Sequence, residues 1–246
     1  MNSPAIRRIP VLLYHKIGVA PTGVRNPRTW VAPDRFAWQM NYLSRWGWRC
    51  ITPGALAAHY RGEKEADSKS ILITFDDGSR SCYQEAFPVM RSLGLTATVF
   101  IVSGQLGGRA VWDRNPDHPD DELLTIGEIR ELTEAGWSIG AHSMTHARLP
   151  NLSREEAERE IRESKRRLEE TLSTPIGTFA YPYGAYAPEH AGMVRKAGYE
   201  IGFTTHYPEQ GLFAIRRENI HGEVYALRFL WRFRRAKRGL FQHVEA

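Results

Sequence analysis

The chain has 246 residues, of which 42% are hydrophobic, and 33 lysines and arginines against 28 aspartates and glutamates give it a formal net charge of +5. This composition suits a folded protein with a sizeable core and argues against a disordered chain. No apolar run is long enough to span a bilayer, no secretory signal sequence opens the chain, and Cys50 and Cys82 alone make no disulfide framework. We therefore expect a single domain over residues 1–246 and a cytoplasmic protein.

Short apolar runs alternate with helical patterns along most of the chain. The runs that predict strands are 11–14, 71–75, 98–102, 138–141, 178–181, 201–204 and 213–216. Two segments rich in Gly, Pro and charged residues, 19–30 and 104–121, are predicted as long loops. This alternation favours an α/β fold in which helices cover a parallel sheet.

The clearest predicted helix starts after Ser153, which forms a capping box with Glu156. Its apolar positions lie three or four residues apart or at sums of these spacings, and Glu and Arg occupy the other face. These apolar positions are Ala157, Ile161, Leu168 and Leu172. The pattern predicts a helix that covers the sheet with one side.

A basic amphipathic segment near the end of the chain is predicted as a helix at about 224–238. Its basic residues are Arg228, Arg232, Arg234, Arg235, Lys237 and Arg238, interleaved with Leu227, Phe229, Leu230, Trp231 and Phe233. Such a helix could lie peripherally on an anionic membrane surface, at the inner membrane face. It could equally dock its aromatic side on the fold and leave its arginines in solvent. Nucleic acid is not expected as a partner, because no recognition motif accompanies the charge.

Residues suited to catalysis follow the predicted strands. Asp76 and Asp77 follow the second strand, and because neighbouring carboxylates repel and are costly to bury unpaired, they indicate a divalent cation. His142 and His146 follow the fourth strand, and on a helical turn their spacing would place both imidazoles on one side. One carboxylate and two imidazoles leave positions open for water and substrate, which is typical of a catalytic metal site. From these residues alone, either aspartate could be the ligand.

Each motif taken alone has an ordinary explanation. Asp-Asp-Gly is most often a turn, and His-x-x-x-His is more often an accident of surface composition. A third motif, Tyr181-Pro182-Tyr183-Gly184, also follows a predicted strand. Because the carboxyl ends of parallel strands meet on one face of an α/β fold, the three motifs are expected to converge on one pocket.

The motifs Thr74-Phe75-Asp76-Asp77-Gly78 and His142-Ser143-Met144-Thr145-His146 resemble those of the polysaccharide deacetylase family, the carbohydrate esterases of family 4 that share the NodB homology domain. Pro182-Tyr183-Gly184 matches the third motif of that family in part. The resemblance covers roughly residues 10–220. It implies a distorted (β/α)7-type barrel and a metal-dependent hydrolase that removes N- or O-acetyl groups from a glycan.

The resemblance also implies roles for single residues. Asp76 is expected to be the general base. The implied ligands of one divalent metal ion are Asp77, His142 and His146. Zinc is the expected ion, and cobalt and nickel suit the same ligands. The backbone N–H of Tyr183, between Pro182 and Gly184, is expected to help stabilise the oxyanion.

The chain departs from the family pattern in two places that concern the base. Ala180 stands where the family often has an arginine, so another residue would have to orient the base, and Arg216 or Arg217 is a candidate. No aspartate follows Asp121, so the later aspartate-containing motif of the family is absent.

The expected general acid lies at the opposite end of the chain from its usual place. The family carries this histidine in a Leu-x-His motif near the C-terminus, whereas here the match is Leu13-Tyr14-His15. This order resembles the permuted subgroup that acts on poly-β-1,6-N-acetylglucosamine, which makes His15 the expected acid. The alternative is a core histidine that is hydrogen-bonded under a loop.

The expected substrate is the N-acetyl group of N-acetylglucosamine units in a polysaccharide or oligosaccharide. Two alternatives stay open: an O-acetyl esterase that acts on another glycan, and a non-catalytic glycan-binding module on the same scaffold. An Fe(II) oxygenase uses similar ligands but normally has an antiparallel jelly roll. Candidates to stack on sugar rings are Trp30, Trp112, Tyr183 and Tyr186.

Overall fold

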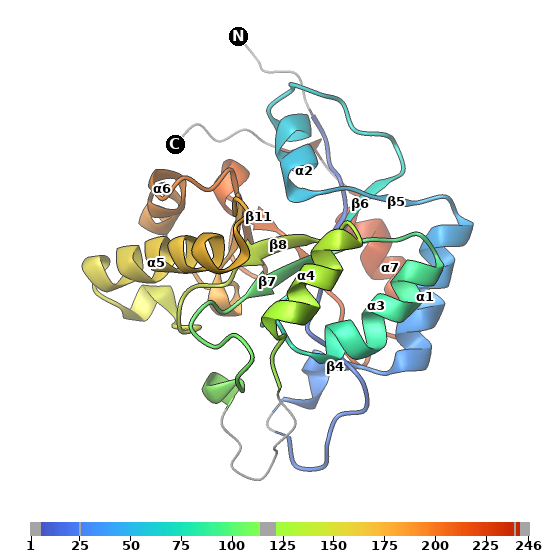
Figure 1. Cartoon of the computed structure of the whole chain (residues 1–246). Helices are drawn as coiled ribbons and strands as arrows, with labels where there is room; N and C mark the ends of the chain where they lie inside the picture. Colours follow the sequence, from blue (N-terminus) through green and yellow to red (C-terminus); the bar gives the residue numbers. More distant parts are fainter. Residues whose placement is uncertain (1–5, 25, 114–121, 239, 242–246) are drawn as a thin grey trace.

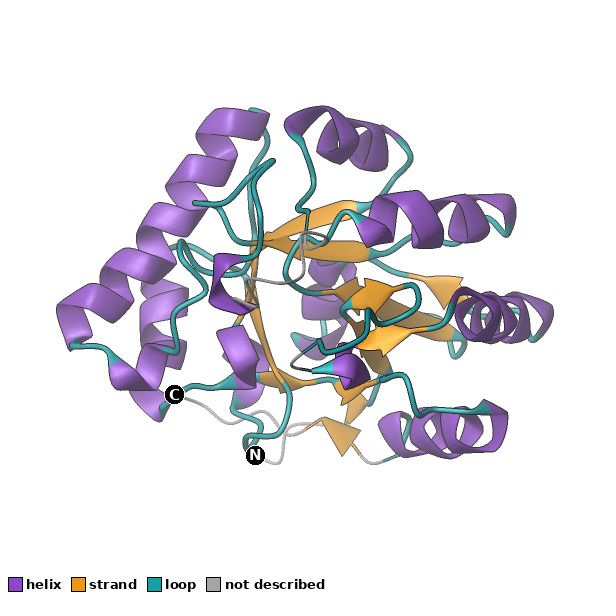
Figure 2. Cartoon of the chain, turned by 90° about the horizontal axis from the view of Figure 1, so that it is seen from below, coloured by secondary structure: helices purple, strands orange, loops and turns teal. Residues whose placement is uncertain are grey.

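The computed structural model describes residues 6–24, 26–113, 122–238 and 240–241, so the last part of the loop predicted at 104–121 lies outside the described residues. Its centre is a parallel barrel surrounded by helices (Figures 1 and 2). The strands are β2 (Val11–Tyr14), β6 (Ser70–Phe75), β7 (Thr98–Ile101), β8 (Ser138–Ala141), β9 (Thr178–Ala180), β10 (Ile201–Thr204), β11 (Ile215–Arg216) and β12 (Glu218–Asn219). Each of the seven predicted strands is present, and the last is shortened because Gly211–Phe213 form a 3-10 turn.

The barrel closes through one short segment near the end of the chain. The strand order is β11-β10-β9-β8-β7-β6-β2-β12, and a single residue, Arg217, separates β11 from β12. The amide of Arg217 donates to the carbonyl of Thr204 in β10, and the amide of Ile220 donates to the carbonyl of Leu13 in β2. Segment 215–220 therefore pairs with one edge of the sheet in its first half and with the other edge in its second half. This segment takes the place of a seventh strand, which agrees with the predicted (β/α)7-type barrel.

Seven helices lie outside the barrel in the described part of the chain (Figure 2). They are α1 (Pro33–Arg45), α2 (Pro53–Tyr60), α3 (Phe87–Ser92), α4 (Ile126–Glu134), α5 (Arg154–Leu172), α6 (Pro188–Lys196) and α7 (Ala226–Ala236). In the described residues, none of these helices combines the length and the hydropathy that a bilayer crossing needs. Small strands complete the fold: β1 (Ile6–Arg7) pairs with β13 (Leu240–Phe241), β3 (Lys16–Ile17) with β4 (Trp30–Val31), and β5 (Arg49–Cys50) with β6.

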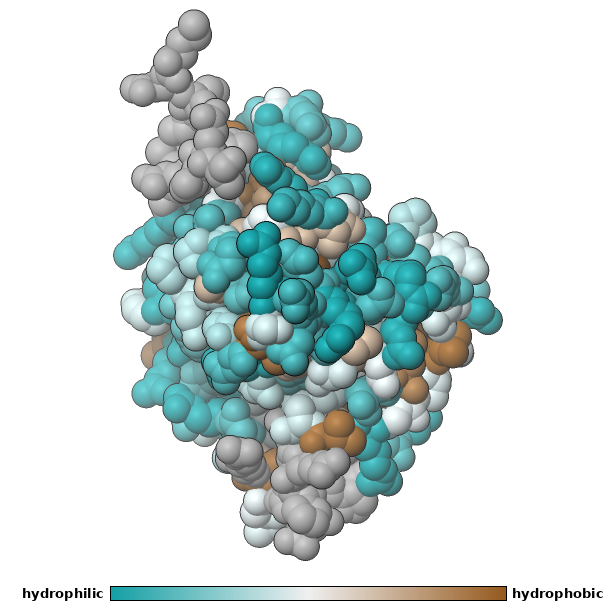
Figure 3. All heavy atoms as spheres, turned by 90° about the vertical axis from the view of Figure 1, so that its left-hand side faces the viewer, coloured by the Kyte–Doolittle hydropathy of each residue, from teal (hydrophilic) through white to brown (hydrophobic). Residues whose placement is uncertain are grey.

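Helix α5 has the predicted start and the predicted buried side. The Ser153 and Glu156 side chains cap its first turn reciprocally, and Ala157, Ile161 and Leu168 are buried. Its outer side carries ion pairs between residues four apart, such as Arg166 with Glu170. Figure 3 looks onto this side of the molecule, where the surface is largely hydrophilic.

Alternate residues of each strand point into the barrel, because side chains in a strand have a period of two. Phe100, Phe203 and Leu72 form part of an apolar cluster that contains Val11 and Ile215 from other strands. The inward series of β6 continues from Leu72 to Thr74 and Asp76. The closing segment likewise continues from Ile215 to Arg217, whose guanidinium lies over the rings of Phe100 and Phe203 at 5.2 and 5.8 Å from their centroids. An aspartate and an arginine thus enter the same apolar interior from β6 and from the closing segment, which lie on either side of β2.

Candidate metal centre and active site

Most of the predicted site residues line one cavity of about 210 Å³ at the carboxyl ends of the strands. The predicted residues that line it are His15, Asp76, Asp77, His142, His146, Tyr183 and Gly184. Pro182 is buried in the turn beside the cavity and does not line it. A larger cavity of about 480 Å³ lies at the amino ends of β8 and β9 and contains none of these residues. The predicted convergence of the three motifs is therefore observed.

Backbone turns in the left-handed region build the site. Of five non-glycine residues with positive φ in the described chain, four belong to the site motifs: Asp77 (71°), Ser143 (61°), His146 (63°) and Tyr183 (60°). Such conformations are uncommon for residues other than glycine, and they cluster at functional sites. The predicted helical turn at the histidines is wrong: this segment is irregular, and its two left-handed residues bring the imidazoles together instead.

The histidine loop is anchored by Glu160, a residue of α5 that is 6% exposed. Its Oε2 accepts hydrogen bonds from the amides of Met144 and Thr145, both at 2.9 Å, and its Oε1 accepts one from the Thr145 hydroxyl at 2.8 Å. Within the loop, the amide of His146 donates to the Ser143 hydroxyl at 3.0 Å. The sequence gives no sign of this role, because Glu160 sits among other charged residues of the helix.

We expect Glu160→Ala to destabilise the protein, because two amides of the loop would lose a buried acceptor. The loss of one buried hydrogen-bond partner costs about 1–3 kcal/mol in free energy of unfolding, which urea titration can measure. Affinity for a divalent ion should fall by roughly tenfold to a hundredfold, since such supporting contacts orient metal ligands. Glu163→Ala is the matched control on the same helix, because the partners of Glu163 are the exposed arginines Arg162 and Arg166. Equal losses in both variants would contradict the anchoring role.

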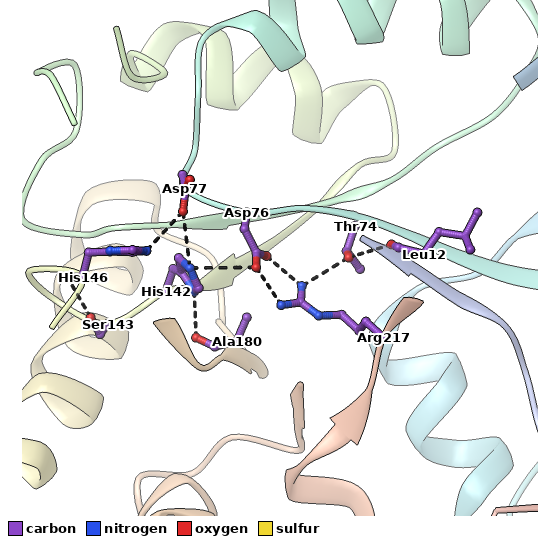
Figure 4. A network of polar contacts seen from close by, with 9 residues as sticks. All are labelled: Leu12, Thr74, Asp76, Asp77, His142, Ser143, His146, Ala180 and Arg217. Carbon is purple, nitrogen blue, oxygen red and sulfur yellow. Dashed lines mark hydrogen bonds and ion pairs between the residues drawn. The ribbon is translucent and has the colours of Figure 1, made fainter. Parts of the chain in front are cut away.

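Asp77, His142 and His146 form a compact buried set (Figure 4). The Nε2 atoms of His142 and His146 lie 3.5 and 3.2 Å from Asp77 Oδ1. One ligand atom from each residue lies within 4.8 Å of the other two. A tetrahedral site with three protein ligands and one open position needs this kind of convergence.

The hydrogen bonding of His142 tests whether the set fits a cation. Its Nδ1 must donate to the carbonyl oxygen of Ala180 at 2.8 Å, because a carbonyl only accepts. In the neutral imidazole this leaves a lone pair on Nε2, which faces the carboxylate of Asp77. Facing lone pairs in a buried place repel unless a proton or a metal ion lies between them. The donor set therefore fits a divalent ion.

The charges of the set move the pKa values of its members toward the ionised forms. Burial alone would raise the pKa of Asp77, but the hydrogen bonds from His142 and His146 hold that pKa well below its usual range. Burial alone would lower the pKa of His142, and the charges of Asp76 and Asp77 raise it instead. A proton and a metal ion would compete for the same place, so metal binding should release protons.

Asp76 is held mainly by Arg217, and the Nε2 of His142 lies 3.9 Å from its Oδ2 (Figure 4). The guanidinium donates two hydrogen bonds of 2.7 Å, one to each carboxylate oxygen, and a third of 3.2 Å to the hydroxyl of Thr74. Burial would raise the pKa of Asp76, but the charges of Arg217 and His142 outweigh it and lower that pKa. Of the two arginines proposed to replace the one missing at Ala180, Arg217 reaches the aspartate. Arg216 is exposed.

Two aromatic rings flank His146 at the cavity. The indole of Trp112 stacks on the imidazole with centroids 4.5 Å apart, and the ring of Tyr183 meets it edge-on at 4.5 Å. Both belong to the set of aromatic residues that the sequence offers as candidates to stack on sugar rings. Tyr186 is instead buried against Tyr181, and Trp30 does not line the cavity. Residues of the lining without a predicted role are Leu13, Asn26, Thr29, Thr205, His206 and Asn219.

Comparison with known proteins identifies similar sequences. Residues 63–202, more than half of the chain, match the family model described as polysaccharide deacetylase. YxkH of Bacillus subtilis (strain 168), which bears the name of a polysaccharide deacetylase, is 28% identical over 217 residues, covering 87% of this chain and 71% of YxkH. The poly-beta-1,6-N-acetyl-D-glucosamine N-deacetylase of Staphylococcus aureus (strain MSSA476) is 26% identical over 158 residues, covering 59% of this chain and 51% of that enzyme. The chain thus spans about half the length of the staphylococcal protein.

A similar barrel occurs among solved structures. The Streptococcus pyogenes deacetylase PplD in complex with acetate superposes with a TM-score of 0.79 at 24% identity, covering 92% of this chain and 98% of PplD. At this identity the match concerns the fold. The predicted NodB-like barrel is confirmed.

Proposed function

The chain belongs to the polysaccharide deacetylase family, and from this we propose that it is a metal-dependent hydrolase that removes N-acetyl groups from N-acetylglucosamine units of a polysaccharide or oligosaccharide. The staphylococcal relative carries this substrate class in its name. The observation that carries the proposal is the division between two adjacent carboxylates. Asp77 faces two imidazoles, whereas Asp76 is oriented by Arg217. Hydrolysis with a general base beside a metal ion needs this division.

Three residues would hold the ion in this proposal. They are Asp77, His142 and His146. When bound, a divalent ion at this place lowers the pKa of a water molecule and polarises a carbonyl oxygen. Zinc is the first choice for one carboxylate and two imidazoles, and cobalt and nickel also suit them.

The side chains of the cavity then move the protons. Asp76 takes a proton from the water that attacks the carbonyl carbon of the acetyl group, and Arg217 keeps its carboxylate ionised and oriented. The backbone N–H of Tyr183 donates to the oxygen that becomes negative. His15 gives a proton to the sugar nitrogen as the carbon–nitrogen bond breaks. Acetate and a free amine leave.

The test is release of acetate from a panel of acetylated oligosaccharides, with and without a chelator. The proposal expects acetate and a new amine from N-acetylglucosamine oligomers, and loss of both after removal of the metal. Release of acetate from O-acetylated xylan oligomers alone would show instead that the protein is an O-acetyl esterase. Binding of the oligomers without any release of acetate would show instead that the protein is a glycan-binding module.

We expect Arg217→Gln to lower kcat by roughly tenfold to a hundredfold, because Asp76 would lose both of its orienting hydrogen bonds. Burial raises the pKa of Asp76, and without the guanidinium mainly His142 remains to lower it, so the pKa of Asp76 rises in this variant. The acidic limb of the pH–rate profile should therefore move to higher pH.

Arg217→Lys, which keeps the positive charge, should restore part of kcat and return the acidic limb of the pH–rate profile toward lower pH. In the wild-type protein the ionised Asp76 contributes stability above its unfolded pKa, and this contribution is lost as pH falls through the lowered folded pKa. A Gln variant with reduced rate but an unmoved acidic limb would contradict the assigned role of Arg217.

A further inference from the structure

The outward side of α7 exposes large apolar residues. Phe229 and Phe233 are buried and anchor the helix on the fold, as one of the two interpretations of the sequence predicted. Leu227 and Trp231, one turn apart on the opposite side, are 82% and 57% exposed. A docked terminal helix gains nothing from exposing these two side chains to water, so docking explains only one side of the helix.

The same outward side carries positive charge that no carboxylate of the described residues neutralises. Glu218, which is buried, pairs with Arg232 and Arg235 and so accounts for two of the arginines. The other three arginines of α7 and the residues that follow it are Arg228, Arg234 and Arg238. All three are exposed, and no carboxylate in the described part of the chain pairs with them. Leu227 and Trp231 therefore lie among exposed arginines, three of which form no ion pair with a described carboxylate.

Helix α1 packs beside α7 (Figure 1), and two more exposed tryptophans belong to α1 and its C-terminal cap. Trp38 is 41% exposed and Trp46 is 60% exposed. The Trp38 ring stacks on Tyr42, the Trp46 ring lies tilted against Tyr42 at 6.0 Å, and Tyr42 meets Phe229 of α7 edge-on. The surface formed by Leu227, Trp231 and the three unpaired arginines, together with Trp38 and Trp46, is called the α7 surface below.

We propose that the α7 surface binds an anionic lipid bilayer. Tryptophan and leucine enter the boundary between headgroups and acyl chains, and arginines interleaved with them meet the phosphates of anionic lipids. The polar sides of such interfacial helices are typically rich in arginine and lysine. A nucleic acid would match the charge, but it would leave the exposed Leu227 without a partner.

The position of α7 would bring the catalytic cavity toward the bilayer. The segment before the helix contacts the cavity rim: Glu223 pairs with Arg28 at 3.2 Å, and the amide of Gly222 donates to the carbonyl of Arg28. Asn26 and Thr29, on either side of Arg28, line the cavity. A glycan held at a membrane surface would then meet the cavity mouth. This consequence rests on the proposed function, whereas lipid binding itself does not.

Sedimentation of the full chain with vesicles tests the proposal. We expect binding to vesicles that contain phosphatidylglycerol and much weaker binding to vesicles of phosphatidylcholine alone. Trp231→Ser combined with Leu227→Ser should lower the partition coefficient by about tenfold or more, and so should Arg228→Glu combined with Arg234→Glu. Circular dichroism and acetate release from a soluble oligosaccharide should match the wild-type values in both variants.

Arg154→Glu combined with Arg162→Glu is the matched control. It makes the same change in net charge on α5, where these side chains are 70% and 68% exposed and belong to a hydrophilic face. This control should keep wild-type binding. The proposal would be overturned if the wild-type chain bound neither kind of vesicle or bound both kinds equally. It would also be overturned by an equal loss of binding in the α5 control, or by binding to duplex DNA in place of vesicles. Because vesicle binding needs no substrate, its outcome is separate from that of the acetate assay.

Discussion

Replacement of Asp76 by Asn is expected to lower kcat by roughly 10²–10⁴-fold, the usual contribution of a general base, and to leave the content of bound metal unchanged. The amide cannot take a proton from water, whereas the Asp77, His142 and His146 side chains would remain as they are. Acetate release and elemental analysis of the purified variant measure the two quantities.

The controls for this variant address folding and charge. Asp67→Asn changes an aspartate outside the cavity and should keep the wild-type rate. Because Asn at position 76 leaves the buried guanidinium of Arg217 unpaired, the variant should also lose stability, by about 3–5 kcal/mol for a buried pair broken on one side. The double variant Asp76→Asn, Arg217→Gln removes both charges and should regain part of that stability without regaining turnover. A wild-type rate in a folded Asp76→Asn protein would show that another group is the base.

Replacement of His142 by Ala is expected to abolish both metal binding and turnover. His142 would be one of three protein ligands, and its Nε2 lies 3.5 Å from the carboxylate of Asp77. Without it, one carboxylate and one imidazole remain, which is too few for a tight site in proteins. Elemental analysis and acetate release, before and after addition of excess zinc, measure the loss.

His206→Ala is the matched control for the metal site. His206 lines the same cavity but does not belong to the compact set of ligands, so its removal should leave one equivalent of metal in place. Removal of the metal from the wild-type protein by a chelator should reproduce the loss of turnover in His142→Ala, and zinc should restore it only in the wild type. A His142→Ala protein that kept one tightly bound ion would exclude the assigned ligand set.

Much of the site could be predicted because its residues lie at the ends of strands that the sequence marks clearly. Asp76 and Asp77 follow an apolar run, His142 follows another, and a parallel sheet brings such ends to one face. The predicted strands at 138–141 and 201–204 have the observed bounds. The fold class follows from the same alternation of strands and helices.

Other features of the site depend on packing that no local pattern encodes. The closing segment pairs with two different strands over two residues each, which is too short for a recognisable alternation, so the sequence could not separate Arg217 from Arg216. Glu160 looks like any charged residue of an exposed helix face. The spacing of the two histidines suggests a helical turn, because spacing alone contains no information on the left-handed backbone at Ser143.

The closing segment 215–220, which completes the barrel, has a consequence for how the proposed activity would be gained and lost. The proposed metal ligands Asp77, His142 and His146 all precede position 147, whereas the proposed base Asp76 is held by Arg217, 141 residues further along the chain. A growing chain would therefore complete the proposed ligand set, with the supporting contacts of Glu160 and Ala180, before the closing segment fixes the proposed base. In mild denaturant, the short pairings on either side of Arg217 should open early, so that turnover stops while the ion is still bound.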